Sequence, residues 1–213
     1  MIQVQQFTFN PFQENTYVFF NESKMAVILD PGCASPNEEK QLESFILNQG
    51  LKVVEIWLTH AHIDHVLGLN YCTENWKVPY RIHPLEVSQL KAVESYAPNY
   101  GFNNFCHPQA DKILQEAGTV SLGNEIFQVL FVPGHAPGHI AFYHKDSGRI
   151  WAGDVLFQSS IGRTDLPGGD FDTLAASIRN QLYNLPDETI VFPGHGPETK
   201  IGIEKKFNSF VRA

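Results

Sequence analysis

The sequence predicts a mixed α/β fold in which sheets are covered by helices. Strand and helix patterns alternate along both halves of the 213-residue chain. Some successive strands are joined by short turns typical of hairpins and others by helical segments typical of crossovers, which argues against a purely parallel sheet. Apolar residues make up 43% and charged residues 18%, a globular composition. One domain is the default for this length, and two small domains would also fit it.

The expected strands are short apolar runs that stop at turn residues such as Asn10-Pro11, Asp30-Pro31-Gly32 and Gly123-Asn124. They cover residues 7–9, 17–20, 25–29, 53–58, 78–82, 119–122, 126–132, 140–144, 150–152 and 190–192.

The expected helices show apolar residues at helical spacing. Leu42, Phe45 and Ile46 follow this spacing after Pro36, and Gly50 closes the segment. Further helices are expected from about residue 66, over 85–96 and over 174–182. Residues 98–108 are rich in Asn, Pro and aromatic side chains and predict a loop.

Charge and cysteine content exclude several classes of protein. The net charge of −8 argues against a nucleic-acid or anionic-membrane binder, because such proteins depend on clustered Lys and Arg. Three scattered cysteines do not make a disulfide framework. The first residues lack the basic and apolar pattern of a secretory signal, and no apolar run approaches the roughly 20 residues needed to span a bilayer. We therefore expect a cytoplasmic protein that does not enter membranes.

Four potential metal ligands, His60, His62, Asp64 and His65, lie within six residues directly after a predicted strand. In an extended segment His60 and His62 point to the same side and can reach one cation. If the chain turns into a helix at Asp64, then Asp64 and His65 can face a second cation. Imidazole and carboxylate are ligands for Zn²⁺ when thiolate is absent, and iron and manganese also accept them. The alternative, an accidental cluster of solvated histidines, is disfavoured by this density.

Three later turns have a related design. Pro133-Gly134-His135 and Pro193-Gly194-His195 each place a histidine just past an apolar strand, and Asp154 follows Ala152-Gly153 in the same way. Side chains on loops at strand ends are common in active sites. These three residues are therefore further candidate ligands.

The ligand series and its order resemble those of the metallo-β-lactamase superfamily. The resemblance covers nearly the whole chain and implies an αββα sandwich with a site along the edge of two sheets. It further implies that His60, His62 and His135 bind one metal ion, that Asp64, His65 and His195 bind a second, and that Asp154 bridges them. The implied cofactors are two divalent ions, with zinc favoured and iron or manganese as alternatives.

The resemblance also implies a mechanism. Two cations about 3.5–4 Å apart share a water and lower its pKa from about 15.7 towards 7, so that a bridging hydroxide attacks a carbonyl group. Asp64 is expected to orient this nucleophile in addition to binding metal. The chain has no G-x-S-x-G motif, and the mechanism requires no serine triad.

Within the superfamily, the chain is similar to glyoxalase II and its short relatives. The similarity lies in three stretches, residues 133–139, 153–157 and 162–170. It implies hydrolysis of a small-molecule thioester such as S-lactoylglutathione, whose thiolate leaves without strong acid help because its pKa is near 8.5. Only 18 residues follow His195, so we expect one domain over 1–213 without the helical glutathione-binding domain of full-length glyoxalase II. Arg163 matches a glutathione-contacting position and is a candidate substrate-binding residue, although an ion pair with Asp165 or Asp170 would explain it equally well.

Other interpretations stay open at this point. Persulfide dioxygenase is a relative that would use one iron held by His60, His135 and Asp154. A non-catalytic metal-binding protein is a third class, although a structural zinc site needs only four ligands. A β-lactamase is disfavoured because Asp154 stands where many such enzymes have a Cys ligand. His139 is expected to hydrogen-bond to a ligand, Asp30 either to orient a ligand histidine or to cap a turn, and the oligomeric state is open.

Overall fold

The computed structural model describes residues 2–108, 112–114 and 117–213. Backbone contacts divide the chain into two units, Met1–Leu114 with Leu122–Glu125, and Gln115–Ser121 with Ile126–Ala213. The expectation of a single domain over 1–213 stays a prediction.

The first unit contains a six-stranded sheet in the order β1-β2-β3-β4-β5-β6. The first three strands pair antiparallel as hairpins, and β3 to β6 pair in parallel. Hairpins need only short turns, whereas the parallel pairs are joined by longer crossover segments that contain helices. The strands are β1 (Gln3–Phe9), β2 (Glu14–Phe20), β3 (Met25–Leu29), β4 (Lys52–Trp57), β5 (Tyr80–Ile82) and β6 (Lys112–Ile113).

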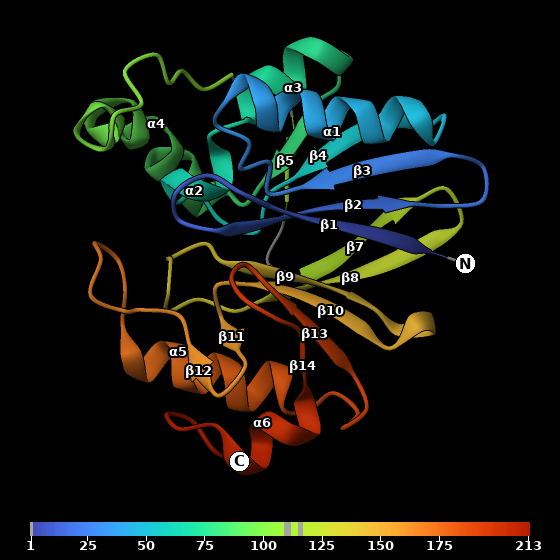
Figure 1. Cartoon of the computed structure of the whole chain (residues 1–213). Coiled ribbons are helices and arrows are strands. Elements are labelled where there is room, and N and C mark those ends of the chain that lie inside the picture. The colour runs from blue at the N-terminus through green and yellow to red at the C-terminus, as the bar shows by residue number, and fades with distance from the viewer. Residues whose placement is uncertain (1, 109–111, 115–116) are drawn as a thin grey trace. The chain divides into compact units, whose positions relative to one another are not determined.

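Helices cover one face of this sheet (Figure 1). The helix α1 begins with a capping box between Ser35 and Glu38 and buries Leu42 and Ile46 in the core shared with the sheet. The helices of this unit are α1 (Pro36–Asn48), α2 (Ile63–Val66), α3 (Leu69–Trp76) and α4 (Val87–Tyr96), with 3₁₀ turns at Pro84–Glu86 and Ala97–Tyr100. The crossover between β3 and β4 therefore supplies α1, and the crossover between β4 and β5 supplies α2 and α3.

The second unit contains a six-stranded sheet in the order β14-β13-β10-β9-β8-β7. The β10–β13 pair is parallel, and β9 pairs antiparallel with both β8 and β10. The strands are β7 (Ala117–Leu122), β8 (Glu125–Phe131), β9 (Ile140–His144), β10 (Arg149–Gly153), β13 (Ile190–Pro193) and β14 (Thr199–Lys200), and a separate small hairpin comprises β11 (Leu156–Phe157) and β12 (Ser160–Ile161).

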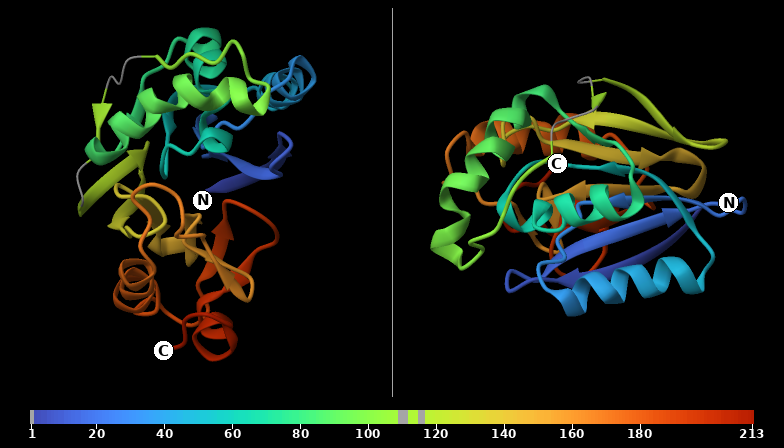
Figure 2. Two further views of the ribbon diagram at one scale, coloured as in Figure 1. Left: turned by 90° about the vertical axis from the view of Figure 1, so that its left-hand side faces the viewer. Right: turned by 90° about the horizontal axis from the view of Figure 1, so that it is seen from above.

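Helices of the second unit pack on its sheet (Figure 2). The helix α5 (Phe171–Ser177) is capped by Asp170 and continues into a π-helical turn over Ile178–Leu182, and α6 (Ile201–Phe207) follows β14. A further 3₁₀ turn covers Lys145–Ser147. Gly134 has φ 126°, and a Cβ there would lie 2.2 Å from the Leu174 nitrogen, so only glycine allows this close approach of loop and helix.

Most predicted elements are present with small shifts at their ends. The predicted strands 25–29 and 140–144 coincide with β3 and β9. The sequence pattern does not predict β6, β11, β12, β14 or α6, because these elements are too short to show a clear hydrophobic period. In the described parts of the chain, no helix combines the length and the apolar character that crossing a bilayer requires.

Candidate metal centre

In the first unit the predicted ligands His60, His62, Asp64 and His65 lie in the segment 59–65, which is called the metal loop here. This segment follows β4 and enters α2. His60, His62 and His65 are buried, and Asp64 is partly exposed. The His60 ring centroid lies 4.8 Å from that of His62 and 4.2 Å from that of His65. The strand end and the first turn of helix thus bring these histidines together, and their role as metal ligands stays a prediction.

Hydrogen bonds determine which nitrogen of His60 is available for a cation. The Thr59 hydroxyl donates to Asp30 Oδ2 at 2.7 Å, which uses its one hydrogen. His60 Nδ1 lies 2.9 Å from the same hydroxyl oxygen and must therefore be the donor. A neutral His60 then carries its proton on Nδ1, and the lone pair of Nε2 is available for a cation.

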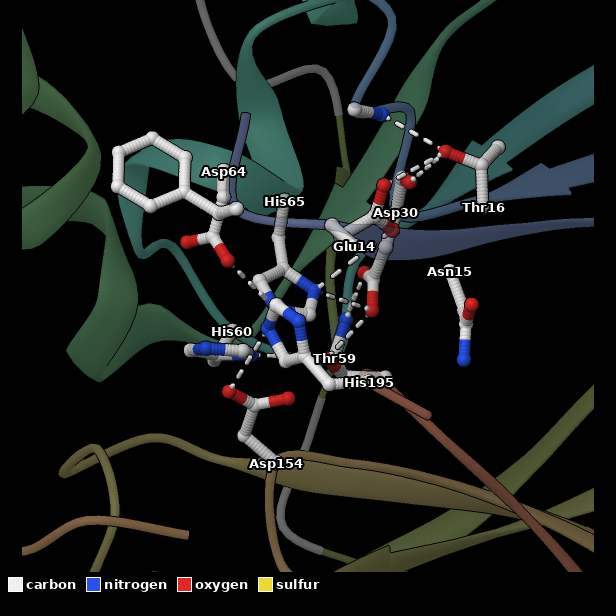
Figure 3. A network of polar contacts seen from close by, with 12 residues as sticks. Glu14, Asn15, Thr16, Asp30, Thr59, His60, Asp64, His65, Asp154 and His195 are labelled. Carbon is white, nitrogen blue, oxygen red and sulfur yellow. Dashed lines mark hydrogen bonds and ion pairs between the residues drawn. The ribbon is translucent and has the colours of Figure 1, made fainter. Parts of the chain in front are cut away.

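Asp30 orients His65 in the same way (Figure 3). The Asp30 carboxylate accepts the Thr59 backbone N–H at 2.7 Å, and its Oδ2 lies 3.1 Å from His65 Nδ1. Since an ionised carboxylate can only accept, His65 Nδ1 carries the proton and the lone pair of Nε2 is available for a cation. Asp30 itself has φ 49°, in the left-handed region that Asp tolerates. Asp30 was predicted either to orient a ligand histidine or to cap a turn, and in the structure it contacts His65.

Glu14 is a fully buried acid beside this network. Its Oε2 accepts from the Thr16 hydroxyl at 2.9 Å, and its Oε1 lies 4.0 Å from His65 Nδ1. Burial raises the pKa of the Glu14 carboxyl well above its usual value, an effect that the nearby His65 opposes.

In the second unit His135, Asp154 and His195 follow the ends of β8, β10 and β13, and their side chains come together. Asp154 Oδ2 lies 3.6 Å from His135 Nε2 and 3.5 Å from His195 Nε2. His135 Nδ1 lies 2.7 Å from the Arg163 carbonyl oxygen and donates to it. The lone pair of Nε2 is therefore again available for a cation. Gly162 allows this packing, because a Cβ there would lie 1.9 Å from the Asp154 carbonyl oxygen.

These distances fit ligands that share a divalent cation. Nitrogen and oxygen ligands lie about 2.0–2.2 Å from zinc, so two ligands at a tetrahedral angle are roughly 3.3–3.6 Å apart. The two Asp154 contacts match this separation, and so does the 3.6 Å between His65 Nε2 and Asp64 Oδ2. All three are longer than ordinary hydrogen bonds of about 2.7–3.2 Å. The donor set in each unit therefore suits a metal ion better than direct pairing.

The remaining predicted residues lie close to these ligands. His139 Nε2 accepts the Asp154 backbone N–H at 3.1 Å, so this nitrogen supports a ligand residue. The Arg163 side chain forms a two-bond ion pair with Asp165, with both distances 2.7 Å. The Arg163 hydrogen bonds hold the pKa of Asp165 at about 2. A substrate-binding role for Arg163 stays a prediction.

Sequence reasoning missed the side chains that hold the metal loop in place. Thr59, Glu14, Asn10 and Glu86 are ordinary polar residues, and neither their types nor their spacing identifies a hydrogen-bond partner. Glu86 is completely buried and accepts the Ala61 N–H at 2.9 Å. The sequence offers one signal, the acid Glu86 between the apolar residues Leu85 and Val87, and it does not identify a partner.

The sequence model of the metallo-beta-lactamase superfamily matches residues 9–195. The chain belongs to this superfamily. Its predicted αββα metallo-β-lactamase fold is confirmed by this match together with the two helix-covered sheets and the solved structures below. The superfamily binds divalent metals, in agreement with the donor sets in each unit.

Two curated relatives match along nearly their full length. The probable metallo-hydrolase YqgX of Bacillus subtilis is 37% identical over 203 residues, which cover 94% of this chain and 93% of the relative. The hydroxyacylglutathione hydrolase GloC of Haemophilus influenzae is 36% identical over 215 residues, with 95% and 94% covered.

Solved structures show the same similarity. The B3 metallo-beta-lactamase BLEG-1 superposes with a TM-score of 0.90 at 36% identity, covering 99% of this chain and 100% of that one. The protein TTHA1623, solved in a di-iron-bound form, gives 0.87 at 38% identity, with 97% and 100% covered. ETHE1 from Myxococcus xanthus gives 0.79 at 25% identity, with 97% and 83% covered.

Proposed function

We propose that this protein is a binuclear metallohydrolase that cleaves a small-molecule thioester such as S-lactoylglutathione. In this proposal two divalent cations are held by seven ligands: His60, His62, Asp64, His65, His135, Asp154 and His195. The observation that carries the proposal is the spacing of imidazole nitrogens and carboxylate oxygens at 3.5–3.6 Å, with Nδ1 of His65 and His135 bound to an acceptor.

The bound cations would supply a nucleophile at neutral pH and stabilise the oxyanion that forms on the attacked carbonyl. The protein's contribution is orientation. Asp30 and Thr59 hold His65 and His60 so that the lone pair of each Nε2 is available for a cation. Asp154 Oδ2 lies near both His135 and His195. That single oxygen near two ligand histidines supports the bridging role. Asp64 is proposed to orient the nucleophile, and the departing thiolate needs no acid because its pKa is near 8.5.

The relatives support the reaction class and the choice of metal. GloC is named a hydroxyacylglutathione hydrolase and YqgX a probable metallo-hydrolase, both at more than 35% identity. TTHA1623 was solved with two irons, so iron is a candidate beside zinc. The ligand types accept both ions, and the metal acquired depends on availability as well as geometry.

The test combines metal analysis with a thioester assay on protein purified without a chelating tag. We expect about two Zn or Fe per chain and release of thiol from S-lactoylglutathione. His65→Ala should abolish turnover, whereas His107→Ala should not, because His107 pairs with Glu94 on the surface of the first unit.

Other outcomes would replace the proposal. One iron per chain with oxygen uptake on glutathione persulfide would indicate a dioxygenase. Cleavage of a chromogenic cephalosporin but of no thioester would indicate a β-lactamase, the activity for which BLEG-1 is named. Full metal occupancy without turnover of any of these substrates would indicate a non-catalytic metal-binding protein.

A further inference from the structure

The helix α2, which carries Asp64 and His65, is too short to be stable by itself. It has only four residues, Ile63–Val66, and its N-cap residue, His62, makes no side-chain capping bond. Isolated helices of this length are unstable, because the backbone entropy lost in forming the first turn outweighs the stabilisation from its hydrogen bonds. The placement of Asp64 and His65 therefore depends on contacts with the rest of the unit, which include the burial of Ile63 and Val66 in its core and hydrogen bonds from side chains outside the helix.

Asn10 makes such a contact from the turn between β1 and β2. Its side-chain amide donates to the Asp64 carbonyl oxygen at 3.0 Å and to the Gly32 carbonyl oxygen at 2.9 Å, which uses both hydrogens. Its Oδ1 accepts the Phe12 N–H at 3.0 Å, and its backbone N–H donates to Glu38 Oε1 at 2.7 Å. Asn10 thus ties α2 to the Asp30-Pro31-Gly32 turn and to the start of α1.

Gly32 provides independent evidence that this arrangement is specific. A Cβ at Gly32 would meet Glu14 Oε2 first and would also lie 2.7 Å from the Asp64 carbonyl oxygen and 2.8 Å from Asn10 Nδ2. The glycine therefore leaves the space in which the Asn10 amide reaches α2. The φ of Asn10 is 52°, a left-handed conformation that Asn adopts more readily than most residues.

A different side chain holds the other half of the metal loop. Glu86, the last residue of a 3₁₀ turn, is completely buried, and its Oε2 accepts the Ala61 N–H at 2.9 Å. Ala61 lies between His60 and His62, so this bond fixes the backbone from which both imidazoles project. A hydrogen bond to a buried carboxylate is stronger than one between neutral groups.

We propose that Asn10 and Glu86 are positioning residues that hold the two halves of the metal loop separately: Glu86 positions His60 and His62, and Asn10 positions Asp64 and His65. The inference rests on the proposed function, in which those two pairs of ligands bind different cations. It follows that loss of either side chain weakens one metal site and spares the other.

The experiment is a Co²⁺ titration of metal-free protein, followed by its visible spectrum and by competition with a chelator. Wild type should show two binding steps. Asn10→Ala should lower the affinity of one step about 10–100-fold, the usual effect of losing an outer contact, and Glu86→Ala should lower the other. Asn10→Asp keeps the shape and the acceptor but loses both donated bonds, so it should behave like Asn10→Ala. Both steps falling equally in each variant would overturn the inference.

Single-site backgrounds identify the affected step. Asn10→Ala should weaken Co²⁺ binding in His62→Ala, where the Asp64–His65 site remains, and leave binding unchanged in His65→Ala. The Glu86 variant should show the reverse pattern. If Asn10→Ala weakens Co²⁺ binding in His65→Ala and not in His62→Ala, the assignment is refuted. If one of these backgrounds folds poorly, the other background and the titrations of the single variants still test the assignment.

Asn21→Ala is the matched control. Asn21 also sits at a strand turn, donating to the Leu122 carbonyl oxygen at 3.2 Å and accepting the Met25 N–H at 3.1 Å, but it contacts no predicted ligand in the described part of the chain. Its loss should lower stability without shifting either Co²⁺ step. If wild type binds Co²⁺ in two steps and cleaves the thioester while Asn10→Ala leaves both steps intact, only this inference fails. If wild type binds no metal, the proposed function fails.

Discussion

Asp30→Asn tests whether the carboxylate of Asp30 sets the protonation of His65. The carboxylate is buried at 2% exposure and accepts three hydrogen bonds, from the Thr59 N–H and hydroxyl at 2.7 Å each and from His65 Nδ1 at 3.1 Å. Asparagine has nearly the same shape and tolerates the φ of 49° at this position, so the substitution changes hydrogen bonding without adding backbone strain.

The consequence for His65 follows from the donors available. If the substituted asparagine keeps its oxygen on the Thr59 N–H, its NH₂ group faces His65 Nδ1, and two donors then oppose each other. His65 relieves this by moving its proton to Nε2, the nitrogen proposed to bind metal. A hydrogen bond to a charged group contributes about 1.5–3 kcal/mol, and the replacement bonds to Thr59 are neutral ones of about 1 kcal/mol. We expect the metal-free variant to lose about 2–4 kcal/mol in free energy of unfolding.

Metal affinity gives the second readout. Outer contacts to a ligand histidine are worth about 10–100-fold in affinity, or about 1.4–2.8 kcal/mol. The free energy of unfolding is measured by urea denaturation in chelator, and metal affinity by competition with a coloured chelator. Asp187→Asn, which removes a charge from the ion pair with Lys205, serves as the control and should leave metal affinity unchanged.

Two results would refute the reasoning. The first is an Asp30→Asn variant whose metal affinity stays within about twofold of wild type, since the tautomer argument then fails. The second is an equal loss of affinity in Asp187→Asn, since net charge and not the His65 contact would then be responsible.

Three further substitutions test packing, substrate binding and helix capping. Gly134→Ala should destabilise by about 3 kcal/mol or more in urea, because its Cβ would meet the Leu174 backbone at 2.2 Å, whereas Gly148→Ala, with φ 61° and open space around it, should cost only about 1–2 kcal/mol; equal losses would contradict the packing argument. Arg163→Ala should raise KM for S-lactoylglutathione with little change in kcat, and Asp165→Asn should lower KM by releasing the guanidinium. The pKa of Asp165 is depressed to about 2, so its ion pair is fully present above the unfolded value near 3.9 and is lost only as the pH falls through about 2; the KM effects should therefore be constant from about pH 5 to 8 in steady-state assays. Ser35→Ala should cost about 0.5–2 kcal/mol in urea denaturation by removing one bond of the α1 capping box, and an unchanged midpoint would show that Glu38 alone caps the helix.

The sequence by itself predicts the candidate ligand residues because most of them are local. His60, His62, Asp64 and His65 occur within six residues, and the strand before them and the turn into a helix are visible as an apolar run and a change of period. The Pro-Gly-His turns are equally local. Each is a short motif whose structure depends on neighbouring residues.

Only the tertiary structure shows what orients these ligands. Asn10 and Glu86 are 54 and 25 residues away from the backbone atoms that they bind, and no periodicity links residues that far apart. The same holds for Glu14, whose buried Oε1 lies 4.0 Å from Nδ1 of His65, a residue far along the chain. Hydrogen bonds of this kind depend on the distances between separate elements, whereas the hydrophobic pattern of a sequence specifies only which face of each element is buried.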